Sequence, residues 1–437
     1  MATYYVDQGH GSASDSNAGT SESAPWLTLT RATGQTGPGG LVAGDTCYVK
    51  NGTYLAPSTG DAAFNSSNSG TSGNPIAFRR STGHNPVLDR SSTPHHDEGF
   101  TAPSLFINGR NYVTWDGFTC AAWTAVQVAT STGAIIENMT INPGVAVDPD
   151  TENYCGIYVS NGMTDGIIRY NRISNAQYTV PRQNASGITG YQMNNCQIYN
   201  NEISGCSSGV FLKQNCIDTV VELNYLHDMT GDSILVTGFV VPGACGACLV
   251  ERNKVRNNVI VGGTLGIRFN LADTEADQLE FYNNTVYNVT NMQTADVEDL
   301  SNWKFYNNIA VIADASTAQM GFYGFSPSGL VQNYQCFRRV NSNYWGISVA
   351  GIVRDLATWQ ANSVHDDDSI SQDPLFVGPT TTVAGFKLQG SSPCLNTGRV
   401  GGTSAGAVTN MGAYAVGTEV IGIPLSAAAS ELVRLLG

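Results

Sequence analysis

One short pattern recurs through the middle of the chain and limits its fold more than any other feature. The pattern is an apolar-x-apolar run that ends in Asn and continues with a polar and then an apolar residue. Its six copies end at Asn171, Asn201, Asn224, Asn253, Asn284 and Asn308, at intervals of 30, 23, 29, 31 and 24 residues. A repeat of this length predicts a stack of similar coils, each of which contacts only its neighbours.

A second marker, a small residue followed by an apolar one, alternates with the first. Its copies are Gly156-Ile157, Gly187-Ile188, Gly209-Val210, Ser233-Ile234 and Gly266-Ile267. Each begins a run with apolar residues at every second position, which is typical of a short strand with one buried face. Short strands between Gly and Asn turns, with no helical segment between them, predict an all-β, single-stranded solenoid, the parallel β-helix.

We place the repeated Asn at the bends between strands. Asn tolerates the left-handed conformation that a sharp bend requires, and its amide can bond to the Asn in the coils above and below. The alternative is a β-sandwich with ordinary turn asparagines. It does not explain six copies with the same flanking residues.

The composition supports an all-β fold and excludes several functions. Only 13 % of the residues are charged, whereas Gly numbers 48, so the chain is poor in residues that exposed helices use. With 21 Lys and Arg against 35 Asp and Glu, the net charge is −14, and we expect no binding to nucleic acid. The chain has no run of 18 apolar residues, so we expect no membrane insertion.

Both ends of the chain resemble a known superfamily. The N-terminal segments that carry the resemblance are residues 4–6, 15–20, 25–29 and 44–54, and the C-terminal ones are residues 369–376, 392–398 and 411–414. They are similar to the opening and the ending of pectate-lyase-like right-handed parallel β-helix proteins. The resemblance spans nearly the whole chain and implies the fold. It implies no single activity, because the superfamily includes polysaccharide lyases, glycosidases, phage tailspikes and inert spikes.

The predicted domains follow from this reading. Residues 1–54 form an N-terminal cap and the first rung, residues 55–415 the β-helix, and residues 416–437 a C-terminal extension. Short helices cap the ends, since a β-helix must cover its terminal edge strands. Ser426 can cap a helix over 427–436 whose leucines pack on the chain itself or on a second copy. For a particle-borne spike we expect a homotrimer.

The strand alternation places a first candidate site on the strands of the second marker. Residues between the inward apolar ones point outward, and they include Tyr158, Tyr191, Lys213, Thr237, Arg268 and Asn270. In uronate lyases with this fold, Lys or Tyr removes the proton next to a carboxylate while Arg, Asn or calcium neutralises the developing charge. The resemblance therefore suggests Lys213, Tyr191 and Arg268 as catalytic residues, with Asn270, Thr237 and Tyr158 binding the sugar. The alternatives are a solvated mixed face and simple carbohydrate binding.

The Asn-ending strands supply a second candidate site. Their outward positions include Tyr199, Glu222 and Glu251. Glu222 with Glu251 or Glu202 could act as the carboxylate pair of a glycoside hydrolase, and Tyr199 could stack on a sugar. The alternative is a set of paired surface charges, such as Glu251 with Lys254.

Several acidic, His and Cys clusters are weaker candidates. Asp228 and Asp232 can ligate Ca²⁺ or satisfy turn amides. Residues 95–98 and 365–368 include His, Asp and Glu, which can ligate metals, but we expect both segments to be solvated loops. Cys245 and Cys248 form the one CxxC, and zinc would need two further ligands. We expect most cysteines to be buried thiols.

Taken together, the sequence predicts a spike that binds, and in one reading depolymerises, a polysaccharide or cell-surface glycan along its lateral face. The alternative is a noncatalytic structural or adhesive fibre. No secretory signal is visible at the N-terminus. Either a signal has been removed, or the protein leaves its cell by lysis, within a particle, or not at all. We expect an extracellular or virion-associated protein.

Overall fold

The computed structural model describes most of the chain in two compact units, which are considered separately. The described residues are 1–36, 39–56, 63–89, 103–120, 125–146, 154–178, 185–237, 249–270, 276–296, 302–313, 320–323, 330–340, 347–349, 352–363, 365–378 and 382–423. Unit 1 contains Met1–Gln197 and unit 2 contains Ile198–Gly422. None of the helices among these residues is long and apolar enough to cross a membrane.

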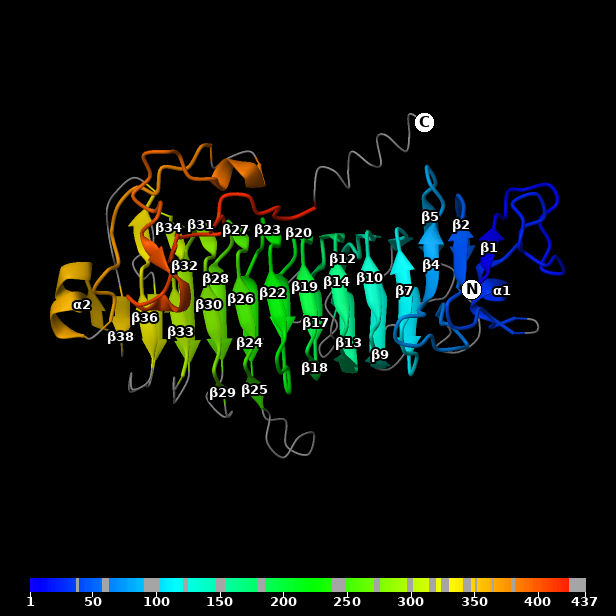
Figure 1. The fold of residues 1–437 in the computed structure, drawn as a ribbon, viewed down its shortest axis with the longest axis horizontal. Helices are drawn as coiled ribbons and strands as arrows, with labels where there is room; N and C mark the ends of the chain where they lie inside the picture. Colours follow the sequence, from blue (N-terminus) through cyan, green and yellow to red (C-terminus); the bar gives the residue numbers. More distant parts are fainter. Residues whose placement is uncertain are drawn as a thin grey trace. The chain divides into compact units, whose positions relative to one another are not determined.

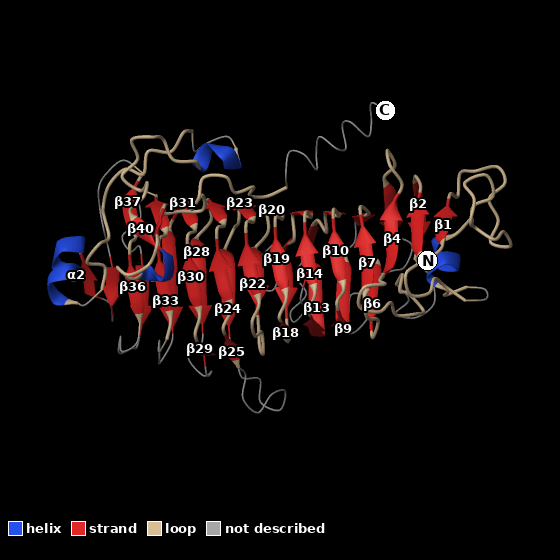
Figure 2. Ribbon diagram, viewed as in Figure 1, coloured by secondary structure: helices blue, strands red, loops and turns tan. Residues whose placement is uncertain are grey.

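Unit 2 is built from three parallel sheets that the chain visits in a fixed order, A then B then C (Figures 1 and 2). Sheet A contains β22 (Val220–Glu222), β26 (Lys254–Arg256), β30 (Glu280–Tyr282), β33 (Lys304–Tyr306) and β36 (Val331–Asn333). Sheet B contains β20 (Glu202–Ser204), β23 (Tyr225–His227), β27 (Val259–Val261), β31 (Thr285–Val289), β34 (Ile309–Ile312) and β37 (Cys336–Arg339). Sheet C contains β21 (Ser208–Leu212), β24 (Asp232–Thr237), β28 (Leu265–Asn270), β32 (Asn291–Asp296), β35 (Met320–Tyr323) and β38 (Ile347–Val349). One strand from each sheet makes one coil of a parallel β-helix.

Unit 1 repeats the same order. Sheet A contains β1 (Thr3–Val6), β2 (Thr46–Val49), β4 (Ile76–Arg80), β7 (Val113–Asp116), β10 (Ile135–Glu137) and β14 (Ile167–Arg169). Sheet B contains β3 (Gly52–Leu55), β5 (Pro86–Asp89), β8 (Thr119–Cys120), β11 (Thr140–Ile141) and β15 (Arg172–Ser174). Sheet C contains β6 (Leu105–Asn108), β9 (Val126–Thr132), β13 (Tyr154–Thr164) and β17 (Ala185–Gly190). The short helix α1 (Leu29–Thr33) begins at Thr28, whose side chain accepts a hydrogen bond from the backbone N–H of Arg31.

The inward positions predicted from the second marker are confirmed in each unit. Ile157 lies beside Ile188 in unit 1. In unit 2, Val210 lies beside Ile234, which in turn lies beside Ile267. All five side chains are fully buried. Alternate residues of each strand thus form one apolar column, because equivalent positions stack directly in a parallel solenoid.

The repeated Asn forms a buried ladder at the bend between sheets A and B. In unit 2 the ladder runs through Asn201, Asn224, Asn258, Asn284 and Asn308, and the backbone N–H and side-chain amide of each donate to Oδ1 of the next, at 2.9–3.1 Å. Gln335 and then Ser369 continue the ladder. In unit 1, Asn171 accepts from the N–H of Met139 and donates to the carbonyl of Ile136.

The left-handed bend and the ladder belong to adjacent residues, not to one Asn as the sequence suggested. The residue before each ladder position has positive φ, as in Tyr170 (56°), Leu223 (56°) and Asn283 (53°). The assignment of Asn253 to the ladder was wrong. Asn258 occupies that place, while Asn253 is buried at another bend, where it bonds to Cys216 and Thr219.

Residues 398–422, here called the C-terminal strap, return along unit 2 and contact the bends. Where the ladder Asn is preceded by a second Asn, that outer residue donates to strap carbonyls. Asn200 bonds to Val420 and Gly422, Asn257 to Ala413, Asn283 to Asn410, and Asn307 to Arg399. The strap also covers apolar residues on the outer side of sheet B, such as Val259 and Ile309, with Met411 and Tyr414. The segment 427–436, for which we expected a helix, lies outside the described residues.

The loop at 365–368 is not the solvated loop that the sequence suggested. His365 and Asp366 are buried. Asp366 accepts hydrogen bonds from Gln332, from Trp359 of helix α2 (Leu356–Asn362) and from Ser369. Burial raises the pKa of Asp366 to about 6, although these hydrogen bonds oppose the shift. The Asp366 carboxyl therefore links α2 to sheet A through hydrogen bonds to Trp359 and Gln332.

We predict that Asn284→Ala destabilises the protein by about 2–4 kcal/mol, because it leaves buried donors and acceptors of two neighbouring coils unpaired. Urea unfolding measures this. Asn194→Ala, at an exposed strand position, is the control and should change the free energy of unfolding by no more than about 0.5 kcal/mol. Equal effects of the two substitutions would contradict a structural role for the ladder.

We also predict that Asp366 makes stability depend on pH. Its pKa rises from 3.8 to about 6 on folding, so the folded state holds a proton that the unfolded state has lost between these values. The resulting stabilisation is present below pH 4 and is lost as the pH rises through 6, and it amounts to roughly 3 kcal/mol. Unfolding followed from pH 4 to pH 7 should show this slope in the parent and in Asp367→Asn, but not in Asp366→Asn. A slope retained in Asp366→Asn would assign it to another group.

Candidate functional site

The predicted Lys213 site lies on the outer side of sheet C in unit 2. The strand register confirms these parts of its columns: Leu235 lies beside Phe211 on one side and Arg268 on the other, and Thr237 lies beside Asn270. The exposure differs from the expectation. Lys213 is only 6 % exposed, and Thr237 is also buried. The sequence predicted an open ladder here, but these side chains are covered. The side chain of Asn270 lies outside the described residues.

Lys213 and Arg268 have different partners. Nζ of Lys213 lies 4.3 Å from the ring centroid of Phe211, a cation–π contact. Nη1 of Arg268 lies 3.9 Å from Oδ2 of Asp232 at the start of β24. Burial raises the pKa of Asp232, and the charge of Arg268 opposes that shift.

Tyr158 and Tyr191 lie in unit 1. Their ring centroids are 6.1 Å apart with the planes at 76°, an edge-to-face pair. Both side chains are half-buried. The pair offers an aromatic surface, and a role in binding sugar stays a prediction.

The two predicted calcium ligands have different contacts, and calcium binding by them stays a prediction. Oδ2 of Asp228 lies 2.7 Å from Nδ1 of His227, whereas Asp232 is buried beside Arg268. Burial lowers the pKa of His227, but Glu202 and Asp228 outweigh it and raise the pKa overall. Within the described residues, no group of three or more His, Cys, Asp or Glu is arranged to hold a metal ion. Residues 95–98, Cys245 and Cys248 lie outside the described residues.

Glu222 belongs to a continuous row on the outer side of sheet A. It lies beside Arg256, which lies beside Tyr282 and then Tyr306. Nε of Arg256 contacts Oε2 of Glu222 at 2.5 Å, and its Nη1 donates to the hydroxyl of Tyr282 at 2.9 Å. The rings of Tyr282 and Tyr306 stack at 4.7 Å. The Glu222 carboxylate is therefore bound to a cation on its own sheet.

Glu251 is not in the same row as Glu222. It ends β25 (Val250–Glu251), which pairs with β29 (Ala276–Asp277) outside sheet A. Its Oε2 contacts Arg252 at 2.7 Å, and Arg252 also binds both oxygens of Asp218 at 2.8 and 2.9 Å. The predicted row was wrong because it rested on Asn253 as a ladder residue. Tyr199 is half-buried at the end of β19 (Gln197–Tyr199).

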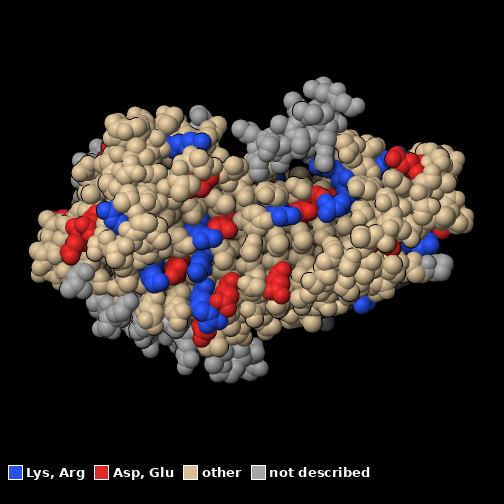
Figure 3. All heavy atoms as spheres, in the orientation of Figure 1, with Lys and Arg blue, Asp and Glu red and all other residues tan. Residues whose placement is uncertain are grey.

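A charged groove lies on sheet A beside this row, and the sequence identified only Lys254 among its charged residues. Its cavity measures about 430 Å³ and is lined by Asp218, Arg252, Lys254, Gln278, Glu280, Asn302, Lys304 and Val331. Nζ of Lys304 lies 2.8 Å from Glu280, and Nζ of Lys254 lies 3.7 Å from it. The side chains of Arg252, Lys254 and Lys304 are each about 40 % exposed. Figure 3 shows that Lys and Arg alternate with Asp and Glu on this face.

Register explains why the sequence missed the groove. Lys254, Glu280 and Lys304 occupy the same position on three successive strands of sheet A. The correct repeat at Asn258 would have aligned them, since each stands four residues before its ladder Asn. The displaced repeat at Asn253 concealed this charged column.

Comparison with known proteins confirms the fold. A protein family described as "Right handed beta helix region" matches residues 104–310 of the sequence. The crystal structure of pectate lyase Pel9A aligns with a TM-score of 0.58 at 16 % identity, over 95 % of this chain and 96 % of that chain. A rhamnogalacturonan lyase aligns with a TM-score of 0.47 at 15 % identity, over 73 % and 84 %. No curated protein matches the sequence. The chain therefore has the pectate-lyase-like right-handed parallel β-helix fold.

We predict that Lys213→Ala lowers the melting temperature, although an exposed strand lysine would not. Lys213 is buried against Phe211, so truncation removes both the packed stem and the cation–π contact, at a cost of about 1–3 kcal/mol. Differential scanning calorimetry measures the change. Lys304→Ala, at a site 40 % exposed, is the matched control. An unchanged melting temperature for Lys213→Ala would show that the side chain contributes no packing.

Proposed function

We propose that the protein binds an acidic polysaccharide along the outer side of sheet A, with the charged groove of unit 2 as its binding site. The observation that supports this most directly is the composition of the groove. Arg252, Lys254 and Lys304 gather there beside Asp218 and Glu280, with Glu251 also paired to Arg252. Three partly exposed cations thus cluster on a protein whose net charge is −14. A carboxylate on a sugar can bind such cations by charge-assisted hydrogen bonds.

The direction of the groove suits a polymer. Lys254 and Lys304 are two strands apart in sheet A, so their backbone positions are separated by roughly 10 Å along the stacking direction, while both ammonium groups approach Glu280 between them. A polysaccharide lying along the coils would contact both lysines with different sugar units. The stacked rings of Tyr282 and Tyr306 belong to the same strands, and aromatic rings commonly pack against the apolar faces of sugars. The fold of a pectate lyase agrees with such a ligand.

The contacts of the candidate catalytic residues favour binding over cleavage by those residues. Lys213 is buried, whereas a general base must reach the proton that it removes. Glu222 and Glu251 are each held by an arginine, and they do not share a row of sheet A. We therefore favour a noncatalytic binding protein over a depolymerase. The assay described below tests for cleavage by other residues.

The test is a binding panel with acidic and neutral polysaccharides. We expect polygalacturonate or alginate to bind and neutral galactan and xylan to bind more weakly, as measured by affinity electrophoresis and calorimetry. Added salt should weaken binding because the groove is exposed. The same samples are followed for absorbance of unsaturated uronate and for release of reducing ends. An increase in either would show that the protein also cleaves the polysaccharide.

Variants locate the site. The double variant Lys254→Ala/Lys304→Ala should bind the acidic polysaccharide at least about tenfold more weakly. Lys387→Ala removes an exposed lysine outside the groove and should bind like the parent. If the double variant and this control bind with equal affinity, the groove is not the binding site. If the protein prefers neutral polymers, its ligand is not an acidic polysaccharide.

A further inference from the structure

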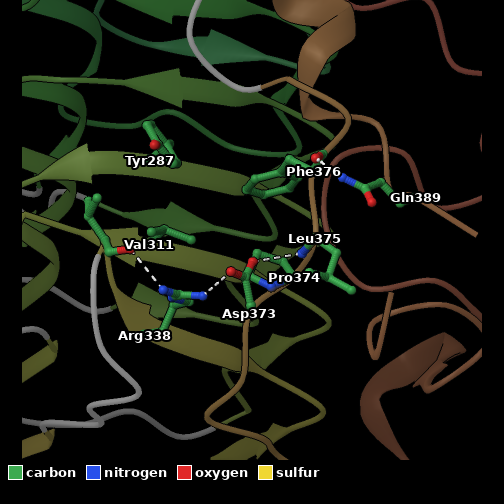
Figure 4. A pocket seen from close by; sticks show the side chains of 9 residues that line it. Tyr287, Val311, Arg338, Asp373, Pro374, Leu375, Phe376 and Gln389 are labelled. Atoms are coloured by element: carbon green, nitrogen blue, oxygen red, sulfur yellow. Dashed lines mark hydrogen bonds and ion pairs between the residues drawn. The ribbon is translucent and has the colours of Figure 1, made fainter. Parts of the chain in front are cut away.

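A second pocket lies between sheet B of unit 2 and the segment that follows α2. It measures about 240 Å³ and is lined by residues that include Tyr287, Arg338, Asp373 and Phe376. Figure 4 shows the two aromatic side chains at one side of the pocket and the Arg338–Asp373 ion pair at the other. The sequence did not single out any of these residues for function.

The polar side of the pocket is held in place by the chain. Arg338 is 9 % exposed, and its Nε and Nη2 donate to the carbonyls of Arg339 and Val340. Its Nη1 pairs with Asp373, whose other oxygen accepts from the N–H of Leu375 at 2.9 Å. Asp373 remains about half exposed. The pair thus presents a donor and an acceptor side by side, fixed by backbone contacts.

The apolar side is an aromatic wall. The ring centroids of Tyr287 and Phe376 are 6.2 Å apart, and both rings lie 5.4 Å from that of Phe386 in η1 (Val383–Phe386). All three contacts are edge-to-face, which fixes the orientation of the rings. The cavity is smaller than the roughly 300 Å³ at which pockets for drug-sized ligands begin, so it suits a single ring.

We propose that this pocket binds one neutral pyranose. Neighbouring hydroxyls of a sugar can accept from Arg338 and donate to Asp373 at the same time, while a C–H face of the ring packs on Tyr287 and Phe376. The ligand is neutral because Asp373 already matches the charge of Arg338, the one cation among the described residues that line the pocket. A uronate would place a second carboxylate beside that aspartate. The charged groove differs, since three cations gather there, and this proposal does not rest on polysaccharide binding there.

Saturation-transfer NMR and calorimetry with single sugars test the proposal. The probes are the methyl glycosides of glucose, galactose, mannose and xylose, with glucuronate and galacturonate as the charged counterparts. We expect at least one neutral glycoside to bind with a Kd on the order of 1 mM, as a small ligand allows, and more tightly than its uronate. The absence of binding by all four at millimolar concentrations, or tighter binding of the uronates, would overturn the proposal.

Two variants place the binding in this pocket. Asp373→Asn removes the acceptor charge, and Tyr287→Leu removes a ring while keeping an apolar side chain. Each should weaken binding at least about tenfold, with folding checked by calorimetry. Asp367→Asn, the same change at an exposed position, and the groove variant Lys254→Ala/Lys304→Ala should bind like the parent. If both Asp373→Asn and Tyr287→Leu bind the sugar as tightly as the parent, the binding site does not lie in this pocket.

Discussion

The buried asparagine ladder is the interaction on which the rest of unit 2 depends. A side-chain amide without partners is costly to bury, yet Asn224, Asn258 and Asn284 are fully buried. Each is tolerated because its oxygen accepts from the coil below and its nitrogen donates to the coil above and to a backbone carbonyl. A slip of one residue in any coil would break these bonds on both sides. The ladder therefore fixes the register, and the register decides which side chains share a column.

The fold could be predicted from the sequence because it rests on short periods. Alternation at every second residue identified Ile157, Ile188, Val210, Ile234 and Ile267 as inward, and the structure confirms this. The register of one coil was mispredicted, since Asn253 and Asn258 both have an apolar residue three positions before and another two positions after. Contact with Asn224 and Asn284 identifies Asn258 as the ladder residue. That single displacement put Glu251 in the wrong row and concealed the column of Lys254, Glu280 and Lys304.

Exposure was the second quantity that the sequence could not supply. Strand alternation tells which side of a sheet a residue faces, but not whether another segment lies over that side. Lys213 and Leu235 occupy outward positions of sheet C and are buried nonetheless. On sheet B the covering segment is the C-terminal strap, far away in sequence. The doubled asparagines at 200–201, 257–258, 283–284 and 307–308 were its signal in the sequence, because the outer residue of each pair bonds to a strap carbonyl.

In unit 2, many outer side chains of sheet B and several of sheet C are buried. In unit 2 the outer residues of sheet B, such as Val259 and Val311, are packed under the strap and the residues before it. Phe211 and Leu235 on sheet C are buried as well. Among the described residues of sheet A, the column of Lys254, Glu280 and Lys304 stays in contact with solvent. Its ion pairs are partly exposed, so they are weak and can exchange a protein carboxylate for one from a ligand. Burial of these apolar side chains thus leaves the charged column of sheet A in contact with solvent, and this is the face on which we propose that a polysaccharide binds.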